Sequence, residues 1–424
     1  MMKTRLISLD VLRGLTIILM TIVNNPGDWG HVYSPLLHAE WHGCTPTDLV
    51  FPTFLFIVGV SVVLATPQKI LNANSFQKII TRTIRIFCLG MFLYFFSKIH
   101  AFGLEGLLLL GFRLILTAII VVALFSDYDK KLQFYLALAV FVIMMILAFG
   151  GFKDYETVRI PGVLQRIAIV YFIVSILYLK TNWKTQAIFG VTVLLTYWAL
   201  MTLIPVPGVG EPNFEKGTNL AAWLDNYLLP GHLWITSKTW DPEGILSTLP
   251  AIGTGIAGLL VGTLLTNSFS KDKKALYLFI GAISGIVIGL IWNTVFPINK
   301  ALWTSSYVLY AAGIASLCLV ILYYVIDVLG ISGWTKFFVI FGVNPMVVFF
   351  FSGIIPRVLS GIKVAYPNDP AHEPIGLQVY FYEFKLSPLF SDPINASLAY
   401  ALTYLTLWFV ILYILYRNKL VFKV

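Results

Sequence analysis

Residues 107–125 read LLLLGFRLILTAIIVVALF, an apolar run interrupted by a single charge, Arg113. An α-helix needs about 20 such residues to cross the roughly 30 Å of hydrocarbon in a bilayer. Similar runs recur along the chain, so the sequence predicts an all-α, polytopic membrane helix bundle of about 12 transmembrane helices, with residues 1–424 forming one domain. We expect the spans near residues 7–24, 49–66, 79–96, 104–125, 132–150, 161–180, 185–204, 245–266, 275–296, 303–326, 337–356 and 394–416.

The composition agrees with a membrane protein. Of the 424 residues, 58% are hydrophobic and 12% are charged, whereas a soluble domain carries about 25% charged residues. The three cysteines, Cys44, Cys88 and Cys318, are too few and too scattered for a disulfide framework or a CxxC zinc site.

The net charge of +9 follows the predicted topology. With the N-terminus inside, 17 of the 29 Lys and Arg residues fall in cytoplasmic segments, nine fall outside and three fall within spans. The positive-inside rule therefore predicts that both termini are cytoplasmic, and the basic excess gives no support to nucleic-acid binding. The long outer loops, about 25–48, 205–244 and 357–393, are the expected functional surface.

Ionisable residues within spans are costly and need a partner or a function. Asp10 and Arg13 stand three residues apart on one helix face, which allows a structural ion pair or a place at a cytoplasmic cofactor entry. Arg159 and Arg166 flank the start of another span, which suits an anionic or carbonyl ligand as well as pairing within the bundle. Arg113 is interpreted as structural.

The loop after the first span holds half of the six histidines, namely His31, His38 and His42. His38 and His42 are four apart, as zinc ligands on a helix would be, but Gly43 and Pro46 oppose a continuous helix and no third ligand lies nearby. We therefore expect no metal. A histidine here suits proton transfer near neutral pH or a solvated hydrogen-bonding role, and the residues alone leave both open. Motifs of serine hydrolases, P-loop NTPases and dinucleotide-binding enzymes are missing from the sequence.

Ordered blocks along the chain resemble the heparan-alpha-glucosaminide N-acetyltransferase family. They include SLDVLRG at 8–14, VN at 23–24, HAEWHG at 38–43, DLVFP at 48–52 and VRIPGVLQR at 158–166. LIPVPG at 203–208, WDPEGIL at 240–246, PINKALWTSSYV at 297–308 and YR at 416–417 continue the series. Each block alone is weak, but together they span nearly the whole membrane domain.

This resemblance implies an acetyltransferase that takes acetyl-CoA, as co-substrate and without a metal, from the cytoplasmic side and acetylates the amine of a glucosamine-type sugar on the outer side. It implies that His38 is the catalytic general base and that Asn24 assists it. Further candidates for acceptor binding are Glu40, Trp41, Asp48, Arg159, Arg166, Asp241 and Lys300. Candidates for coenzyme binding are Arg5, Asp10, Arg13, Arg82 and Arg85.

The resemblance also implies a possible homodimer. The large N-terminal outer domain of the animal enzymes has no counterpart, which favours a multi-pass protein of a bacterial plasma membrane, and spans within 104–151 have no match in the animal pattern. Two other function classes fit a polytopic chain with polar residues in its spans. One is an O-acyltransferase of a cell-envelope glycan, and the other is a transporter of an amino sugar or glycolipid.

Overall fold

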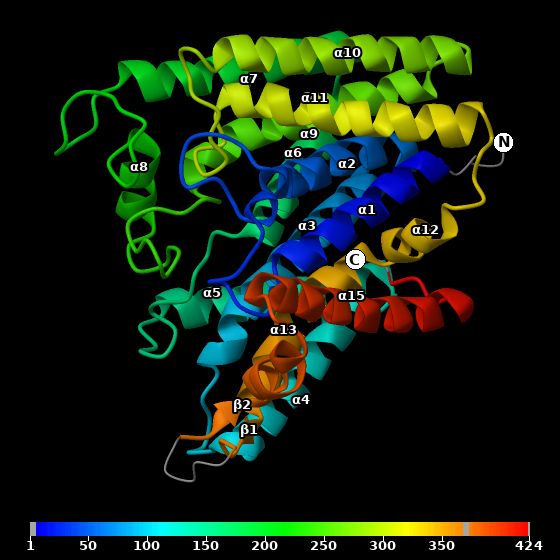
Figure 1. Ribbon diagram of the computed structural model, residues 1–424. Helices are drawn as coiled ribbons and strands as arrows, with labels where there is room; N and C mark the ends of the chain where they lie inside the picture. The colour runs from blue at the N-terminus through cyan, green and yellow to red at the C-terminus, as the bar shows by residue number, and fades with distance from the viewer. Residues whose placement is uncertain (1–5, 368–372, 423–424) are drawn as a thin grey trace.

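The computed structural model describes residues 6–367 and 373–422, and its main elements are helices (Figure 1). The prediction of an all-α, polytopic bundle is confirmed. Ten of the described helices are long and apolar enough to cross a membrane, and one bent pair adds an eleventh. The ten correspond to α2 (Val50–Ala65), α3 (Ala73–Phe95), α4 (Gly106–Phe125), α5 (Lys130–Phe149), α6 (Val163–Lys180), α7 (Trp183–Leu203), α9 (Ile245–Thr266), α10 (Lys271–Trp292), α11 (Ser305–Tyr323) and α15 (Pro393–Arg417).

The first predicted span forms α1 (Ile7–Val23), a helix of 17 residues that is buried along most of its length. Asp10 and Arg13 pair within it at 3.0 Å, which confirms the predicted ion pair. Arg13 also donates to the Ser61 hydroxyl and to the Gly342 carbonyl, so it joins α1 to two neighbouring helices. These contacts account for charge that would otherwise be costly inside the bundle.

The span predicted over 337–356 is present as a bent pair of helices, because the helix breaks at Asn344. α12 (Lys336–Val343) and α13 (Pro345–Gly361) meet at an angle of 73°. Pro345 disfavours a helical conformation at the preceding residue, and Asn344 has φ −120° and ψ 54°. Its buried side chain donates to the Leu420 carbonyl and accepts from the Phe422 amide, so the C-terminal segment is tied to the break.

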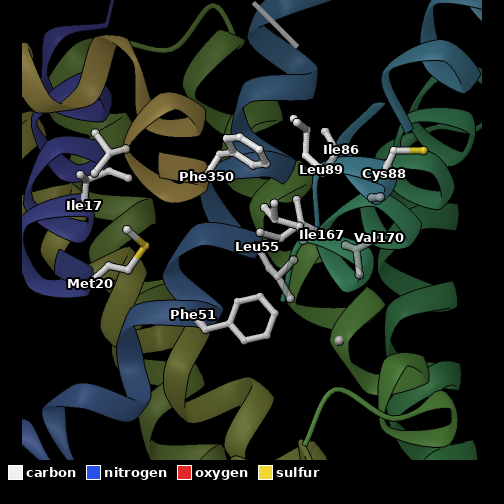
Figure 2. Close-up of a cluster of buried hydrophobic side chains, with 14 of the residues drawn as sticks. Ile17, Met20, Phe51, Leu55, Ile86, Cys88, Leu89, Ile167, Val170 and Phe350 are labelled. Carbon is white, nitrogen blue, oxygen red and sulfur yellow. The ribbon is translucent and has the colours of Figure 1, made fainter. Parts of the chain in front are cut away.

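The helices converge on a continuous apolar core. Figure 2 shows Ile17 of α1, Phe51 and Leu55 of α2, and Phe350 of α13 pointing into it, with side chains of α3 and α6 on the opposite wall. Small residues allow the closest crossings. Gly14 of α1 lies against the Phe338 carbonyl of α12, where even a methyl group would clash with backbone.

Short elements complete the loops at one end of the bundle. They are η1 (Ser34–Leu36), η2 (Pro46–Leu49), η3 (Phe96–Lys98), α8 (Leu220–Leu228), β1 (Lys363–Val364), β2 (Ile375–Gly376), α14 (Leu377–Tyr380), η5 (Phe381–Leu386) and η6 (Ser387–Leu389), and η4 (Tyr324–Val328) extends α11 at the other end. The loop after α1 and the α8 region lie on the side away from the N-terminus (Figure 1). We call this end, which carries the loops 25–48, 205–244 and 357–393, the outer end, following the predicted orientation.

Candidate active site

The site at the outer end begins with a carboxylate and an imidazole from the loop after α1. His38 Nδ1 lies 2.7 Å from Asp48 Oδ1. The other carboxylate oxygen of Asp48 accepts from the amides of Ala39 and Thr45 and from the Thr45 hydroxyl, at 3.0 to 3.1 Å. The Asp48 side chain is 2% exposed while the His38 side chain is 51% exposed. The loop therefore fixes a buried carboxylate behind an imidazole that faces outward.

This geometry sets the tautomer of His38. A carboxylate against Nδ1 favours the proton on that nitrogen, so the lone pair lies on Nε2. His31 forms a similar pair with Asp28 at 2.6 Å, but there both partners are largely exposed. An exposed carboxylate is free to reorient, so His38 is the better-oriented base of the two.

Lys300 reaches the same imidazole from the segment between α10 and α11. Its Nζ lies 3.4 Å from both ring nitrogens of His38. Burial lowers the pKa of Lys300, whereas the charges of Glu243 and Asp48 act in the opposite direction. The site therefore combines a hydrogen-bonded imidazole with a neighbouring ammonium group.

Asn299 holds the segment that carries Lys300. Its side chain accepts from the Leu302 amide at 2.9 Å, and its backbone pairs with Gly43 of the His38 loop. Gly43 has φ +109°, a conformation that favours glycine. Trp303 has φ +52° and is completely buried, which marks this turn as constrained. Two chain segments about 250 residues apart in sequence are thus fastened together around His38.

A second cluster of charged residues, besides His38, Asp48 and Lys300, lies where the loop before α6 meets the start of α9. Arg159 binds both oxygens of Asp241, at 2.5 and 2.7 Å, and one oxygen of Glu243 at 2.5 Å. Burial acts to lower the pKa of Arg159, but the hydrogen bond to Asp241 and the charge of Glu243 outweigh it and raise the value. The Tyr94 hydroxyl accepts from the same guanidinium at 2.9 Å.

Arg166 is the fully buried member of this cluster. It donates to the Gly244 carbonyl and the Ser247 hydroxyl, and its guanidinium lies 4.9 Å from the centre of the Trp303 ring. Its Nε and Nη1 are buried without a hydrogen-bond partner among the described residues. The negative charge of Glu243 acts to raise the pKa of Lys300, so the two clusters interact electrostatically.

Asp225 of α8 closes the cluster from the outer side. Its two carboxylate oxygens accept from the amides of Asp241 and Ile245 at 3.2 and 2.8 Å. Burial raises the pKa of Asp225 to about 7, although the hydrogen bond from the Ile245 amide lowers it. Asp225 therefore caps the start of α9 and attaches α8 to the bundle.

Two of the remaining acceptor candidates have other surroundings. Trp41 donates from its indole to the Phe214 carbonyl at 2.8 Å and packs edge-on against Trp240, so it joins two outer loops. Glu40 is exposed, and no hydrogen bond of its side chain occurs among the described residues. Burial raises the pKa of the neighbouring Cys44 thiol to about 12, so its thiolate form is scarce at neutral pH.

Asn24 makes no hydrogen bond, among the described residues, with the group formed by His38, Asp48 and Lys300. The expectation that it assists His38 therefore has no such contact to support it. Asn24 instead lines a cavity of about 510 Å³ together with Arg357. The backbone amide of Asn24 caps the end of α1.

The predicted coenzyme candidates also have defined positions. Arg85 is buried and donates to the carbonyls of Leu124 and Ser126, so the structure uses its guanidinium to end α4 rather than leaving it free for a phosphate. Arg82 is exposed and stacks over the Tyr171 ring. Asp10 and Arg13 are paired as described above, and Arg5 lies outside the described residues.

Glu243, Asp225 and Tyr94 are part of the site although the sequence did not predict them as site residues. Glu243 stands two residues after Asp241 in an Asp-Pro-Glu-Gly turn, which was a usable signal. Asp225 and Tyr94 lie in apolar helical surroundings, where one polar residue alone does not identify its partner. No group of three or more His, Cys, Asp or Glu residues in the described ranges is arranged to hold a metal ion.

Comparisons with known proteins match the N-terminal third of the chain to a family model and nearly the whole chain to two relatives. Residues 5–153 match a family model described as heparan-alpha-glucosaminide N-acetyltransferase, catalytic. This matched range includes α4 and α5, the pair of spans without a match in the animal pattern. The chain is 28% identical to the human protein and 27% identical to the mouse protein of the name heparan-alpha-glucosaminide N-acetyltransferase. Both alignments cover 99% of this chain and 60% of the relative, so the chain spans about three fifths of the length of these proteins.

Proposed function

We propose that this chain transfers an acetyl group from cytoplasmic acetyl-CoA to the amine of a glucosamine-type sugar on the outer side of the membrane. Two similarities support this proposal: residues 5–153 match the catalytic model of the heparan-alpha-glucosaminide N-acetyltransferase family, and the chain is 28% identical to the human protein of that name. The observation that carries this proposal is the His38–Asp48 pair. It offers an oriented imidazole at the outer end, where a sugar would arrive.

The proposed reaction needs a base because a glucosamine amine is largely protonated near neutral pH and only its neutral form attacks a thioester. His38 Nε2 takes a proton from the amine as the nitrogen attacks the acetyl carbonyl. A carbon–nitrogen bond forms, the carbon–sulfur bond breaks, and the proton on His38 passes to the departing thiolate of coenzyme A. Direct transfer of this kind requires no acetylated histidine.

Asp48 and Lys300 act on this step through position and charge. Asp48 keeps the proton on Nδ1, so Nε2 remains the acceptor nitrogen. The Lys300 ammonium group stands beside the imidazole, where it is placed to stabilise negative charge on the carbonyl oxygen of the tetrahedral intermediate. Asn24 is given no contact with that oxygen in this proposal, because it lines a cavity that His38, Asp48 and Lys300 do not line.

The donor side of the proposal rests on fewer contacts. Arg82 is the predicted phosphate ligand whose guanidinium is exposed, and it remains a candidate for the nucleotide of acetyl-CoA. The charged cluster of Arg159, Arg166, Asp241 and Glu243 is the proposed floor of the acceptor site. The multi-pass architecture agrees with a bacterial plasma membrane as the proposed location.

Coenzyme A release by purified protein tests the proposal. Acetyl-CoA is supplied with and without glucosamine, and products are resolved by chromatography because the three native thiols would react with a thiol dye. We expect amine-dependent release and N-acetylglucosamine in the wild type and loss of both in His38→Ala. His31→Ala is the matched control, because His31 also pairs with an aspartate in the same loop.

The alternatives give different results in the same assay. Acetyl transfer to a glycan hydroxyl but not to an amine would replace the proposal with an O-acyltransferase. Absence of acetyl-CoA binding in protein that remains folded would favour an amino-sugar or glycolipid transporter.

A further inference from the structure

A second feature of the outer end is the cavity lined by Asn24. It has a volume of about 510 Å³ and lies between the end of α1, the end of α3 and the helix α13. Its walls include Asn25, Ser97 and Ser352, and Trp29 of the α1 loop lines it while remaining 63% exposed. His38, Asp48 and Lys300 do not line it. The cavity is therefore separate from the His38 pair, and its volume suits a small organic ligand.

Arg357 is the one charged side chain in the lining of this cavity, which contains no Asp or Glu. A cavity with a cation and no carboxylate favours an anionic ligand. The remaining polar lining residues are neutral serines and amides, including Ser360 and Gln378, which can donate hydrogen bonds to oxygen.

The hydrogen bonding of Arg357 differs from that of the other arginines that are not exposed. Each of those makes an ion pair or donates to at least two oxygens of other segments. They are Arg13, Arg85, Arg113, Arg159 and Arg166. Arg357 donates from Nη1 to the Gly353 carbonyl, one turn earlier in its own helix. Among the described residues it has no other hydrogen bond and no ion pair.

Arg357 thus lines the cavity with most of its five guanidinium N–H donors left without a hydrogen-bond partner among the described residues. An arginine in a membrane-spanning helix is costly without a counter-charge. The protein meets this requirement for Arg13 and Arg159 by placing carboxylates beside them. For Arg357 the described protein supplies none, and the cavity that Arg357 lines is large enough to hold a ligand that supplies it.

We infer that this cavity binds an oxyanion, which is a carboxylate, sulfate or phosphate group, with Arg357 as its charged ligand and the neighbouring amides and hydroxyls as neutral donors. The planar guanidinium matches two oxygens of such a group. Apolar residues at the inner wall, Met20, Leu93 and Phe349, accommodate the uncharged part of the ligand. The group belongs either to an anionic sugar or to the headgroup of an anionic lipid.

The test measures binding without an acyl donor, so it is independent of the proposed transfer reaction. The full chain is placed in nanodiscs of phosphatidylcholine and titrated by calorimetry with D-glucuronate and with D-glucose, which lacks the carboxylate. In a second arm, discs contain equal amounts of phosphatidylglycerol and phosphatidylcholine, and lipids retained after detergent extraction are identified by native mass spectrometry.

Three variants accompany the wild type. Arg357→Gln removes the charge, Arg357→Lys keeps the charge but loses the fork of donors, and Lys363→Gln removes an exposed charge from the adjoining strand β1 as the control. We expect selective binding of glucuronate or selective retention of phosphatidylglycerol by the wild type. Arg357→Gln should weaken that binding about tenfold or more, and Lys363→Gln should leave it unchanged.

The two arms identify the source of the oxyanion. Arg357-dependent binding of glucuronate supports the inference with a soluble ligand, and Arg357-dependent retention of phosphatidylglycerol supports it with a lipid. If Arg357→Gln fails to fold, weaker binding by Arg357→Lys carries the same meaning. Equal binding of charged and neutral probes by the wild type, or anion binding unchanged in both Arg357 variants, overturns the inference.

Discussion

Replacing Asp48 by asparagine should separate the orientation of His38 from the stability of its loop. One oxygen of Asp48 faces His38 alone, while the other accepts from the Ala39 amide, the Thr45 amide and the Thr45 hydroxyl. An asparagine placed there has one oxygen and one NH₂ group to satisfy these two positions. Its oxygen should take the position with three donors, because an NH₂ group there would face two N–H groups.

The NH₂ group of the substituted residue would then face His38 Nδ1 and donate to it. Nδ1 would become an acceptor, the proton would move to Nε2, and the proposed base would be lost at the nitrogen that faces outward. General-base catalysis contributes about 10²- to 10⁴-fold in rate. We therefore expect Asp48→Asn to lower kcat/KM for the amine by about that factor, with little change in thermal stability.

The assay is amine-dependent release of coenzyme A, measured together with the unfolding temperature in the same detergent. Asp28→Asn is the matched control, because Asp28 contacts His31 at 2.6 Å in the same loop but is exposed. We expect its activity to stay within about twofold of the wild type, as is usual for exposed pairs. Activity of Asp48→Asn within about threefold of the wild type would refute this reasoning, as would an equal loss in Asp28→Asn.

Two predictions concern stability. Burial raises the pKa of Asp225 from 3.8 to about 7, so the folded protein keeps this proton while the unfolded chain loses it, and stability should fall by about 3 kcal/mol as the pH rises from about 4 to 7. Unfolding temperatures across this pH range should depend less on pH in Asp225→Asn, and an identical pH profile in the variant would contradict the assignment. Gly14→Ala would place a Cβ 1.9 Å from the Phe338 carbonyl oxygen, so it should cost about 1–3 kcal/mol in thermal unfolding. Gly281→Ala is its control, because a Cβ there meets no atom within 4 Å, and equal stabilities of the two variants would show that α1 and α12 do not cross this closely.

The sequence predicted the helices well because apolar length is a local property. The runs that become α4 and α5 could be recognised without knowing what they contact. The break at Asn344 was missed because the residues on both sides are apolar, and the Asn-Pro step alone was a weak signal. Its energetic support comes from Leu420 and Phe422, which lie 76 and 78 residues further along the chain.

The candidate site, like the fold, was predicted only in part from the sequence. His38 and Asp48 are ten residues apart in one loop. The family resemblance selected His38 as the base and Asp48 as a candidate contact, but it did not single out the hydrogen bond between them. The pairing of Arg159 with Asp241 joins residues 82 positions apart, and a single sequence gives no measure of that distance. The position of Asn24 in a cavity that His38 does not line likewise depends on how α13 packs beside α1, which no local pattern specifies.

The tie between Asn344 and the C-terminal segment also has a consequence for biogenesis. Chains are inserted from the N-terminus onward during synthesis, yet the close helical partners of α1 include α12, through the crossing of Gly14 and Gly342. α12 in turn is completed only when Leu420 and Phe422 reach the break at Asn344. Part of the packing of α1 therefore depends on a segment synthesised several hundred residues later, and we expect a chain truncated before residue 420 to hold the α1–α12 crossing less firmly than the full chain does.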